Sequence, residues 1–506
     1  MMEVRKVLCS VGLAACMTTL SAQVDSLALR YAGTIGVQEL KDHLSILASD
    51  AYQGRDTGKE GQKMAAAYLK AAFIEMGIPP VPAPDPASIV DGYYQPFELI
   101  EERNGNIFIQ ANGKEHRFME DLFYFSENLG TDLVVQEALY LKQGTDARTA
   151  KGKAAEVVIM DDPGNSGAAL IVALRMRVEV AAGLGAKVVL VPTDRLDMLK
   201  AELGHAAGSA HLRLVDGVRQ ETSTRPQLIL VDAAAMSGML RKGDLRKVQR
   251  KGPGRKVLLD MVVQNRSTDE RVISENVLAF IEGTEKKDEV LVITAHYDHV
   301  GVEDGVIYNG ADDDGSGTVA LLEIAEAFAL ARKAGHGPLR SVLVMPVSGE
   351  EKGLLGSRYY SEHPVFPLAN TVADLNIDMI GRRDTAHAAS EPYVYVIGSD
   401  RLSSELHAVN EEANRTYTQL DLDYTFNEKD DPNRFYYRSD HYNFARKGIP
   451  SIFYFSGVHE DYHQPGDDVE KIEFDLLHQR TLLVFHTAWA LANRNERPVV
   501  DKAEGP

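Results

Sequence analysis

Cysteine is almost absent from this sequence of 506 residues, in which it occurs only as Cys9 and Cys16. Because both lie near the N-terminus, the rest of the chain contains no disulfide, no thiolate metal site and no cysteine nucleophile. Any transition metal bound there must be held by His, Asp and Glu side chains. The sequence also lacks an apolar run long enough to predict a membrane-spanning helix.

Basic residues are also scarce relative to acidic ones. The chain has 54 Lys and Arg against 74 Asp and Glu, a formal net charge of −20. A protein of this sign repels a phosphate backbone, so we do not expect a nucleic acid as its partner. The hydrophobic fraction of 44% and the charged fraction of 25% are typical of a globular protein, and the length predicts two or more domains.

The N-terminal segment has the composition of a secretory signal. Arg5 and Lys6 precede an apolar stretch, which ends at the small residues Ser21 and Ala22. We therefore expect residues 1–22 to be removed and the protein to be secreted or periplasmic. The alternative is a lipoprotein, because the sequence Leu-Ala-Ala-Cys at 13–16 resembles a bacterial lipoprotein processing site. It would leave a lipid anchor on Cys16 and hold the protein at a membrane.

Between residues 269 and 497, apolar runs of strand length alternate with helical patterns. The runs cover residues 289–295, 341–347, 371–377, 393–398 and 451–455. The pattern at 318–333 predicts a helix between the first two runs, and Ser316 can cap its start. The alternation predicts an α/β fold with a mixed, mostly parallel central sheet flanked by helices.

The rest of the chain is divided around this domain. Residues 23–125 are predicted to be its N-terminal part, with a helix at 60–76 that follows a Gly-rich turn. Residues 126–268 show buried strands and a helix but no paired acids and histidines, so they predict an inserted β/α domain without catalytic residues. The basic segment 241–256 is predicted to be the linker that leaves this insert, and 498–506 a C-terminal tail.

Acidic and histidine side chains follow the predicted strands of the C-terminal domain. In an open α/β sheet, the loops at the carboxyl ends of the strands form the ligand crevice, so these groups should meet in space. They are His296, Asp298 and His299 after the first run, Asp312, Asp313 and Asp314 before the helix, Glu350 and Glu351 after the second run, Asp378 after the third, and His459 and His463 after the last.

Two histidines with several carboxylates suit zinc or a similar divalent ion, whereas carboxylates alone would suit calcium or magnesium. The cluster offers more ligands than one zinc requires, so we expect two metals that share a bridging carboxylate. The adjacent pair Glu350 and Glu351 then has an explanation, because one carboxylate can bind a metal while the other moves a proton.

Five motifs, in this order, resemble the secreted di-zinc aminopeptidases: HYDHVG, GADDDGSGT, SGEEKGLLGS, NIDMIGR and DYHQPGDD. That superfamily also contains leucyl aminopeptidases, glutamate carboxypeptidase and glutaminyl cyclase. The resemblance covers residues 40–80 and 270–490 and implies the zinc exopeptidase fold. The stretch AAGLGAKVVLVPTD makes the insert similar to a protease-associated domain.

The resemblance implies a role for each matched residue. His296 and Asp378 would bind one zinc, Glu351 and His463 the other, and Asp313 would bridge the two. Glu350 would be the general base and acid, working on a zinc-bridged hydroxide. Asp298 would orient the His296 ring by a hydrogen bond, and Tyr462 would stabilise the oxyanion.

The remaining polar residues are given lesser roles. His299, His441 and Asp312 are expected to support the site or to be structural, and Asp314 to cap a loop. His459 and His463 are four residues apart, so either could be the ligand by spacing; the matched YHQPGDD favours His463, which leaves His459 as a surface residue. Arg438, in a segment similar to the family's substrate-side loop, is a candidate substrate contact.

Three functions remain open to the sequence. The first is a secreted di-zinc aminopeptidase that acts on peptides with a free N-terminus. The second is a carboxypeptidase-type or cyclase-type relative; a carboxypeptidase would need an arginine cluster, for which the sequence offers Arg382, Arg383, Arg434 and Arg438 without ranking them. The third is a non-catalytic peptide-binding protein, although no residue of the implied site is missing.

Overall fold

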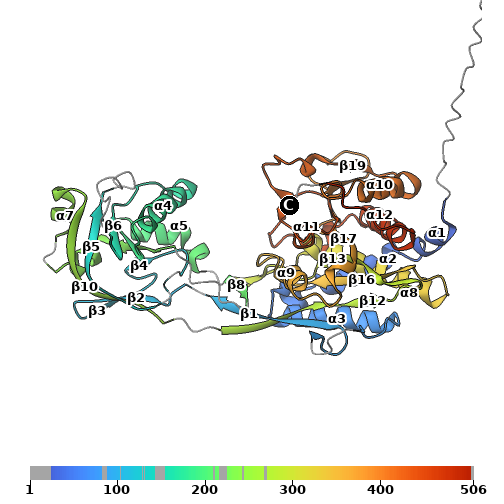
Figure 1. Ribbon diagram of the computed structural model, residues 1–506, viewed down its shortest axis with the longest axis horizontal. Coiled ribbons are helices and arrows are strands. Elements are labelled where there is room, and N and C mark those ends of the chain that lie inside the picture. The colour runs from blue at the N-terminus through green and yellow to red at the C-terminus, as the bar shows by residue number, and fades with distance from the viewer. Residues whose placement is uncertain are drawn as a thin grey trace, which may run out of the picture.

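The computed structural model describes residues 24–82, 88–102, 104–127, 129, 131–142, 154–208, 211–215, 225–241, 244–266 and 270–502. The predicted signal at 1–22, with Cys9 and Cys16, lies outside them. Figure 1 shows two bodies. We call residues 24–102 and 270–502 the main lobe, and residues 104–208 and 225–266 the insert lobe. A sheet of three strands in the order β11-β1-β8 joins them, formed by Glu270–Val277, Tyr94–Glu102 and His211–Leu214.

The main lobe is built on a sheet of seven strands in the order β12-β16-β13-β17-β20-β18-β19. Its four neighbouring strands β16, β13, β17 and β20 are parallel. β12 runs antiparallel to β16, whereas β18 runs antiparallel to β20 and parallel to β19. The mixed, mostly parallel sheet predicted from the sequence is therefore confirmed. The strands are Ala279–Ile281, Arg340–Val347, Lys286–His296, Thr371–Ile377, Ser451–Phe455, Tyr393–Ile397 and Asp421–Asp423, in the same order.

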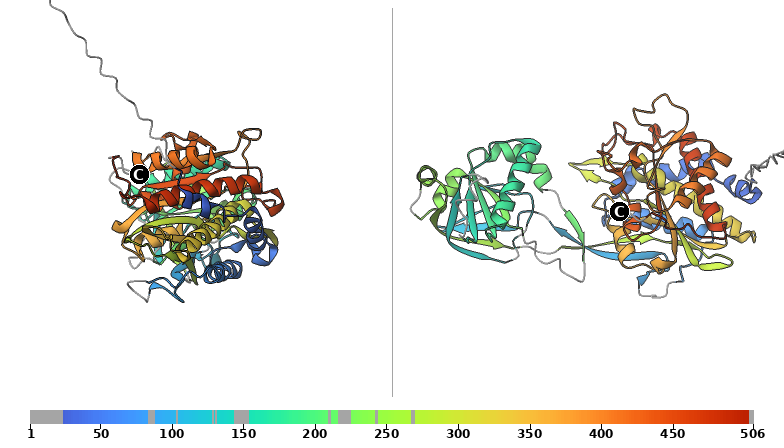
Figure 2. Two further views of the ribbon diagram at one scale, coloured as in Figure 1. Left: turned by 90° about the vertical axis from the view of Figure 1, so that its right-hand side faces the viewer. Right: turned by 45° about the horizontal axis from the view of Figure 1, so that its top comes forward.

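Helices cover both faces of this sheet because successive side chains of a strand point to opposite sides. Leu291 and Ile293 of β13 pack on one face beneath the larger group of helices, whereas Val290 and Val292 pack on the other. The first group is α1 Ser26–Ala32, α2 Val37–Leu47, α3 Glu60–Glu75, α8 Gly317–Lys333, α10 Ser404–Ala413 and α12 Phe474–Asn493; the second is α9 Leu355–Glu362 and α11 His441–Ala445. Figure 2 shows the layers from two further sides.

The start of α8 differs in one detail from the prediction. The Ser316 side chain does not cap the helix; its hydroxyl donates to the carbonyl of Asp312 and accepts from the amide of Ile380. The amide of Gly317 donates to Asp314 Oδ1 instead, at 2.8 Å. Asp314 therefore holds the loop, as expected, and Ser316 ties it to the segment after β17.

The insert lobe has its own sheet of eight strands in the order β3-β2-β10-β5-β6-β7-β9-β4. The strands are Lys114–His116, Ile107–Ala111, Arg255–Asn265, Leu133–Leu141, Val157–Met160, Val188–Thr193, Gln227–Asp232 and Leu122–Phe123, in that order; the helices are α4 Gly167–Ala182, α5 Leu196–Gly208, α6 Ala233–Met239 and α7 Leu245–Lys251. Its core is separate from that of the main lobe.

One predicted boundary and one predicted linker were wrong. The boundary at 125/126 falls after β4, but β2, β3 and β4 pair with strands of the insert, so this lobe begins before residue 107. The segment 241–256 is not a linker, because it contains α7 and the start of β10. In the part of the chain that the structure describes, none of the helices has both the length and the apolar character needed to cross a bilayer.

The two-stranded sheet β14 Gly301–Glu303 and β15 Val306–Tyr308 lies after β13. Short helical turns complete the main lobe: η1 Asp50–Arg55, η4 Ala311–Ser316, η5 Leu368–Asn370, η6 Asn414–Thr418, η7 Thr425–Asn427, η8 Phe435–Tyr437 and η9 Val469–Lys471. Of these, η1 and η4 hold loops of the site described next.

Candidate metal centre

The four parallel strands of the main lobe end at one edge of the sheet and bring the predicted residues together. His296 is the last residue of β13, which pairs with β17 so that Thr294 lies opposite Asn376. Asp378, the residue after β17, is therefore level with His296 at the carboxyl edge. The segment after β16 supplies Glu350 and Glu351, and the loop after β20 supplies His463.

The first group of donors surrounds His296. Its Nε2 lies 3.2 Å from Asp313 Oδ1 and 3.6 Å from Asp378 Oδ1. The other oxygen of Asp378 accepts a hydrogen bond of 2.6 Å from the Ser439 hydroxyl. Asp378 is thus oriented with one oxygen held by the protein and the other turned to the histidine.

The second group surrounds His463. Its Nε2 lies 3.1 Å from Asp313 Oδ2 and 3.1 Å from Glu351 Oε2. Asp313 therefore directs one carboxylate oxygen to each histidine, the geometry that a bridging ligand requires. The structure brings together all five residues to which the resemblance gave a metal.

Buried polar atoms without a partner indicate that this cluster fits a cation. Among the residues that the structure describes, buried atoms that make no hydrogen bond include His296 Nε2, Asp313 Oδ2 and Glu351 Oε1. Such atoms are costly unless an ion or water satisfies them. His296, Asp313 and Asp378 lie close enough to share one ion. Imidazole and carboxylate donors without thiolate suit zinc.

The pKa values of two histidines also indicate that this cluster fits a cation. Burial alone would lower the pKa of His463, but Asp313 and Glu351 raise it to about 10. Burial likewise opposes Asp378 and Asp313, which nevertheless raise the pKa of His296 well above its ordinary value. The carboxylates thus attract positive charge to both rings, and a divalent cation could replace the protons.

Asp298 orients the His296 ring through an atom other than the expected one. His296 Nδ1 lies 3.0 Å from the main-chain carbonyl oxygen of Asp298, whereas the Asp298 carboxylate is 3.9 Å away. That carboxylate instead accepts from the Thr57 hydroxyl at 2.7 Å and from the amide of Glu350 at 3.3 Å. Asp298 therefore positions both the histidine and the segment that carries Glu350.

Glu350 lines the pocket beside these donors, with Asp313 and Asp378. Burial, together with the charges of Glu351 and Asp378, raises its pKa well above the ordinary value. The pair Glu350 and Glu351 is divided as the sequence suggested, because Glu351 contacts histidines while Glu350 faces the pocket. A carboxyl group with raised proton affinity suits proton transfer.

Tyr462 and Arg438 form another part of the pocket wall. Arg438 Nη2 donates to the Tyr462 hydroxyl at 3.1 Å, and the Tyr462 ring stacks on His463 at 3.9 Å between centroids. Burial and the carboxylates Asp313 and Glu351 raise the pKa of Tyr462, so its hydroxyl keeps its proton. Apolar side chains complete the wall, namely Met379, Phe435, Phe453, Phe455 and Val458.

Arg55, which the sequence did not single out, clamps two loops of the centre. Its buried guanidinium donates to four main-chain carbonyls: Tyr297 at 2.8 Å, Leu47 at 2.8 Å, Asn309 at 2.7 Å and Gly310 at 2.9 Å. The carbonyls of Tyr297, Asn309 and Gly310 belong to the two segments that carry His296 and Asp313. The Gly-rich turn noted in the sequence therefore places a cation beneath both ligand loops, and an interaction with carbonyls leaves no side-chain pattern to detect.

Asp467 and His459 support the bridging residue from the other side. Asp467 accepts from the amides of Asp312 and Asp313, with oxygen–nitrogen distances of 3.0–3.1 Å. His459 was expected on the surface, but it is buried, and its Nε2 lies 3.2 Å from Asp312 Oδ2. That expectation was wrong; the histidine spacing alone did not show which of His459 and His463 faces inward.

The other secondary candidates fall into two groups. His441 is buried and stacks on Phe453, with ring centroids 5.0 Å apart, which fits a structural role. His299, expected only to support the site, lies with its Nδ1 3.0 Å from Glu351 Oε1. His299, Asp313 and Glu351 also lie close enough to share an ion.

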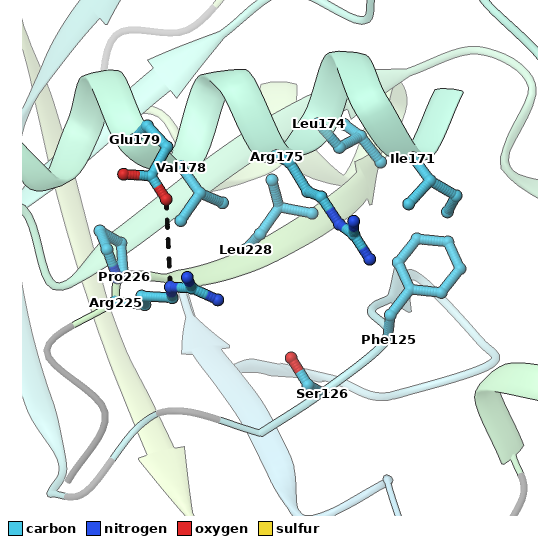
Figure 3. Close-up of a pocket in the computed structure, with 10 residues that line it drawn as sticks. All are labelled: Phe125, Ser126, Ile171, Leu174, Arg175, Val178, Glu179, Arg225, Pro226 and Leu228. Atoms are coloured by element: carbon cyan, nitrogen blue, oxygen red, sulfur yellow. Dashed lines mark ion pairs between the residues drawn. The ribbon is translucent and has the colours of Figure 1, made fainter. Parts of the chain in front are cut away.

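The insert lobe contains a larger cavity of a different kind. Its volume is about 600 Å³, and Figure 3 shows α4 above it, with Arg225 and Glu179 facing each other at 3.9 Å. Leu174, Val178 and Phe125 contribute apolar surface. Among the described residues that line it, Glu179 is the single carboxylate and histidine is absent. The main lobe therefore holds the candidate reaction centre.

Comparison with known proteins agrees with this geometry. Residues 276–488 match the model of peptidase family M28. A segment of 131 residues is 38% identical to a probable glutamate carboxypeptidase of Arabidopsis thaliana, covering 26% of this chain and 17% of that protein. Another of 144 residues is 34% identical to a probable zinc metalloprotease of Pyrenophora tritici-repentis, covering 27% and 29%. The chain thus spans less than a third of either relative.

A likeness in fold covers a larger share of the chain. An aminopeptidase from Aneurinibacillus sp. strain AM-1 superposes with a TM-score of 0.53 at 19% identity, covering 95% of this chain and 99% of that one. At this identity the likeness concerns the fold. The family match covers the strands and loops that carry the five donors described above. Residues 276–488 therefore form a domain that matches peptidase family M28.

Proposed function

We propose that the protein is a zinc-dependent exopeptidase, an aminopeptidase that removes N-terminal residues from peptides. Peptidases of family M28 depend on zinc, and the donors described above fit that metal. The observation that carries the choice of aminopeptidase is the wall of the pocket, whose described lining includes one arginine, Arg438, and that arginine donates to the Tyr462 hydroxyl. A C-terminal carboxylate would need a group of cations to bind it, so this wall favours a substrate recognised by its N-terminal amine.

Two zinc ions per chain are part of the proposal. His296 and Asp378 would hold one, His463 and Glu351 the other, and Asp313 would contact both. When bound, zinc supplies a Lewis acid that polarises the scissile carbonyl and lowers the pKa of water. Positive charge at these places would also offset the repulsion that Glu350 receives from Glu351 and Asp378, and so lower the proton affinity of Glu350.

The side chains of the protein then perform the proton transfer. A carboxylate oxygen of Glu350 takes a proton from the attacking water and gives it to the nitrogen of the leaving amine. Tyr462 keeps its phenolic proton and can donate it in a hydrogen bond to the carbonyl oxygen as negative charge develops there. Arg438 holds the Tyr462 hydroxyl in place.

The arginines argue against a carboxypeptidase. Arg382 donates to Asp461 at 2.7 Å, and Arg383 donates to Glu473 at 3.1 Å. Of the four arginines that the sequence offered, Arg438 is the one that lines the pocket. Recognition of a C-terminal carboxylate by a group of arginines thus has less support here than recognition of an N-terminal amine.

The test is a panel of aminoacyl and dipeptide substrates with either a free or an acetylated N-terminus, assayed before and after chelation. We expect hydrolysis of the free-amine substrates, loss of activity with the chelator and recovery with zinc. Cleavage of acetylated peptides from their C-terminus would overturn the aminopeptidase assignment in favour of a carboxypeptidase. Cyclisation of N-terminal glutamine would favour a cyclase. Peptide binding without turnover would favour a binding protein.

Secretion and the identity of the insert are separate parts of the proposal. The composition of residues 1–22 supports export, and the similarity of AAGLGAKVVLVPTD to protease-associated domains supports an accessory role for the insert. Mass spectrometry of the mature N-terminus tests the first part: a chain that begins after Ala22 fits a removed signal, whereas a lipid-modified Cys16 fits the lipoprotein alternative.

A further inference from the structure

His299 is the buried histidine of the centre to which neither the family resemblance nor the mechanism gives a task. The residue is fully buried, and neither of its ring nitrogens makes a hydrogen bond within the described ranges. Its Nδ1 lies 3.0 Å from Glu351 Oε1 and 3.8 Å from Asp313 Oδ2. An unpaired imidazole directed at two carboxylates requires an explanation.

His296, which the resemblance makes a zinc ligand, shows the same pattern. Its Nε2 is buried, makes no hydrogen bond within the described ranges, and lies 3.2 and 3.6 Å from two carboxylate oxygens. In both rings a nitrogen approaches two carboxylates without aligning with either as a hydrogen-bond donor. This is the arrangement expected when the ring and both acids are directed at a common cation.

The local backbone makes room for the ring. Gly310 has a positive φ of 56°, and a Cβ atom there would come within 2.4 Å of His299 Cγ. The amide of His299 donates to the carbonyl of Arg55 at 3.3 Å, which fixes the chain beside the clamp described above. The His299 and His463 rings stand edge to face, 5.9 Å between centroids, so they approach Glu351 and Asp313 from different sides.

We propose that His299 is a further ligand of the second metal position, through Nδ1. This inference rests on the proposed zinc dependence. The second position would then have His299, His463, Glu351 and Asp313, which fill a tetrahedral zinc site, whereas the first would have His296, Asp378 and Asp313. A filled site holds zinc tightly and structurally, and a site with three protein ligands keeps a place for water or substrate.

The consequence is an unequal pair of ions, which can be measured without an activity assay. The protein is stripped of metal, loaded with one equivalent of zinc, and studied by X-ray absorption, which counts the imidazoles around the metal. We expect two imidazoles per zinc in the wild type, because the first equivalent enters the second position. In His299→Ala we expect one imidazole and a loss of zinc affinity greater than about 100-fold, above the 10–100-fold typical of outer partners.

A matched control is His441→Ala, which removes a buried imidazole outside the cluster and should leave the count and the affinity unchanged. His299→Gln keeps most of the volume of the ring and replaces His299→Ala if that variant does not fold. An unchanged imidazole count in the His299 variants would overturn the inference and make His299 a support for Glu351. Zinc binding with the expected count but without peptide hydrolysis would overturn the proposed function alone.

Discussion

Both lobes place acidic residues at the carboxyl ends of parallel strands, but the two lobes neutralise them differently. In the insert lobe, Asp162 after β6 receives two hydrogen bonds of 2.8 Å from Arg195. Asp232 at the end of β9 accepts from the amide of Ala235 and caps α6. In the main lobe, Asp313 and Glu351 lie opposite histidines and retain buried oxygens without a partner among the described residues.

This difference shows which strand-end acids serve chemistry. A carboxylate that is paired with arginine or with a helix amide stabilises its loop and needs no bound ion. Carboxylates that face one another across histidines repel each other, so a bound cation stabilises them. Cavity volume alone would favour the insert lobe as the reaction centre, because its cavity has about 600 Å³ and the pocket beside the metal centre about 30 Å³.

The largest effect should come from Glu350. Glu350→Gln removes the group that moves the proton but leaves the five donors in place, so we expect kcat/KM to fall by about 10²- to 10⁴-fold while zinc content stays unchanged. The measurement pairs a kinetic assay with metal analysis. Asp162→Asn in the insert lobe is the control, with activity kept. Full activity in Glu350→Gln would contradict the assigned role.

Tyr462 should have the next largest effect. Tyr462→Phe keeps the ring that stacks on His463 and removes the hydroxyl, so we expect kcat to fall by about 10²- to 10³-fold with a smaller change in KM. Arg438→Leu should lower kcat less, because the hydroxyl remains and loses only its partner. A change confined to KM in Tyr462→Phe would show that the hydroxyl binds the ground state of the substrate instead.

Substitution of Arg55 should lower the stability of the main lobe but not that of the insert lobe. Arg55→Met leaves four buried carbonyls without their donor, so we expect the main lobe to lose at least about 3 kcal/mol of unfolding free energy and to bind zinc more weakly. Denaturant unfolding of the zinc-free protein measures the first effect. The two cores are separate, so the insert lobe should unfold as in the wild type. A main lobe of unchanged stability would contradict the clamp.

Zinc uptake should be coupled to proton release. The raised pKa of His463, about 10, and that of His296, also raised, mean that both rings carry protons in the metal-free protein at pH 7. Zinc must displace them, so affinity should rise with pH until about pH 10, by about tenfold per pH unit for each proton released. Calorimetry in buffers of different ionisation enthalpy counts the protons. Uptake without proton release would contradict the electrostatic account.

Much of the fold was predictable because buried parallel strands are continuous apolar runs. The runs at 371–377 and 451–455 have the same bounds as β17 and β20, and the run at 341–347 begins one residue after the start of β16. The insert boundary was not predictable, since β2, β3 and β4 are short and their partners β10 and β9 lie far along the chain. Local patterns cannot show such pairing.

Residues whose side chains would bind metal could be predicted from the sequence, whereas residues whose side chains bind main-chain groups could not. His296, Asp313 and Glu351 were found because their order follows the family. Arg55 and Asp467 act on carbonyls and amides, which every residue has, so sequence patterns do not show such contacts. The contact between His299 and Glu351 was not predicted, because the spacing of His299 from His296 does not show to which side of the loop its ring points.

The most direct test of the whole account is anomalous diffraction at the zinc edge from zinc-loaded crystals. The account predicts two peaks on either side of the Asp313 carboxylate, one beside His296 and one beside His463, and none in the insert lobe. Absence of both peaks from this place, or zinc bound instead at Asp162 or Asp232 of the insert lobe, would contradict it.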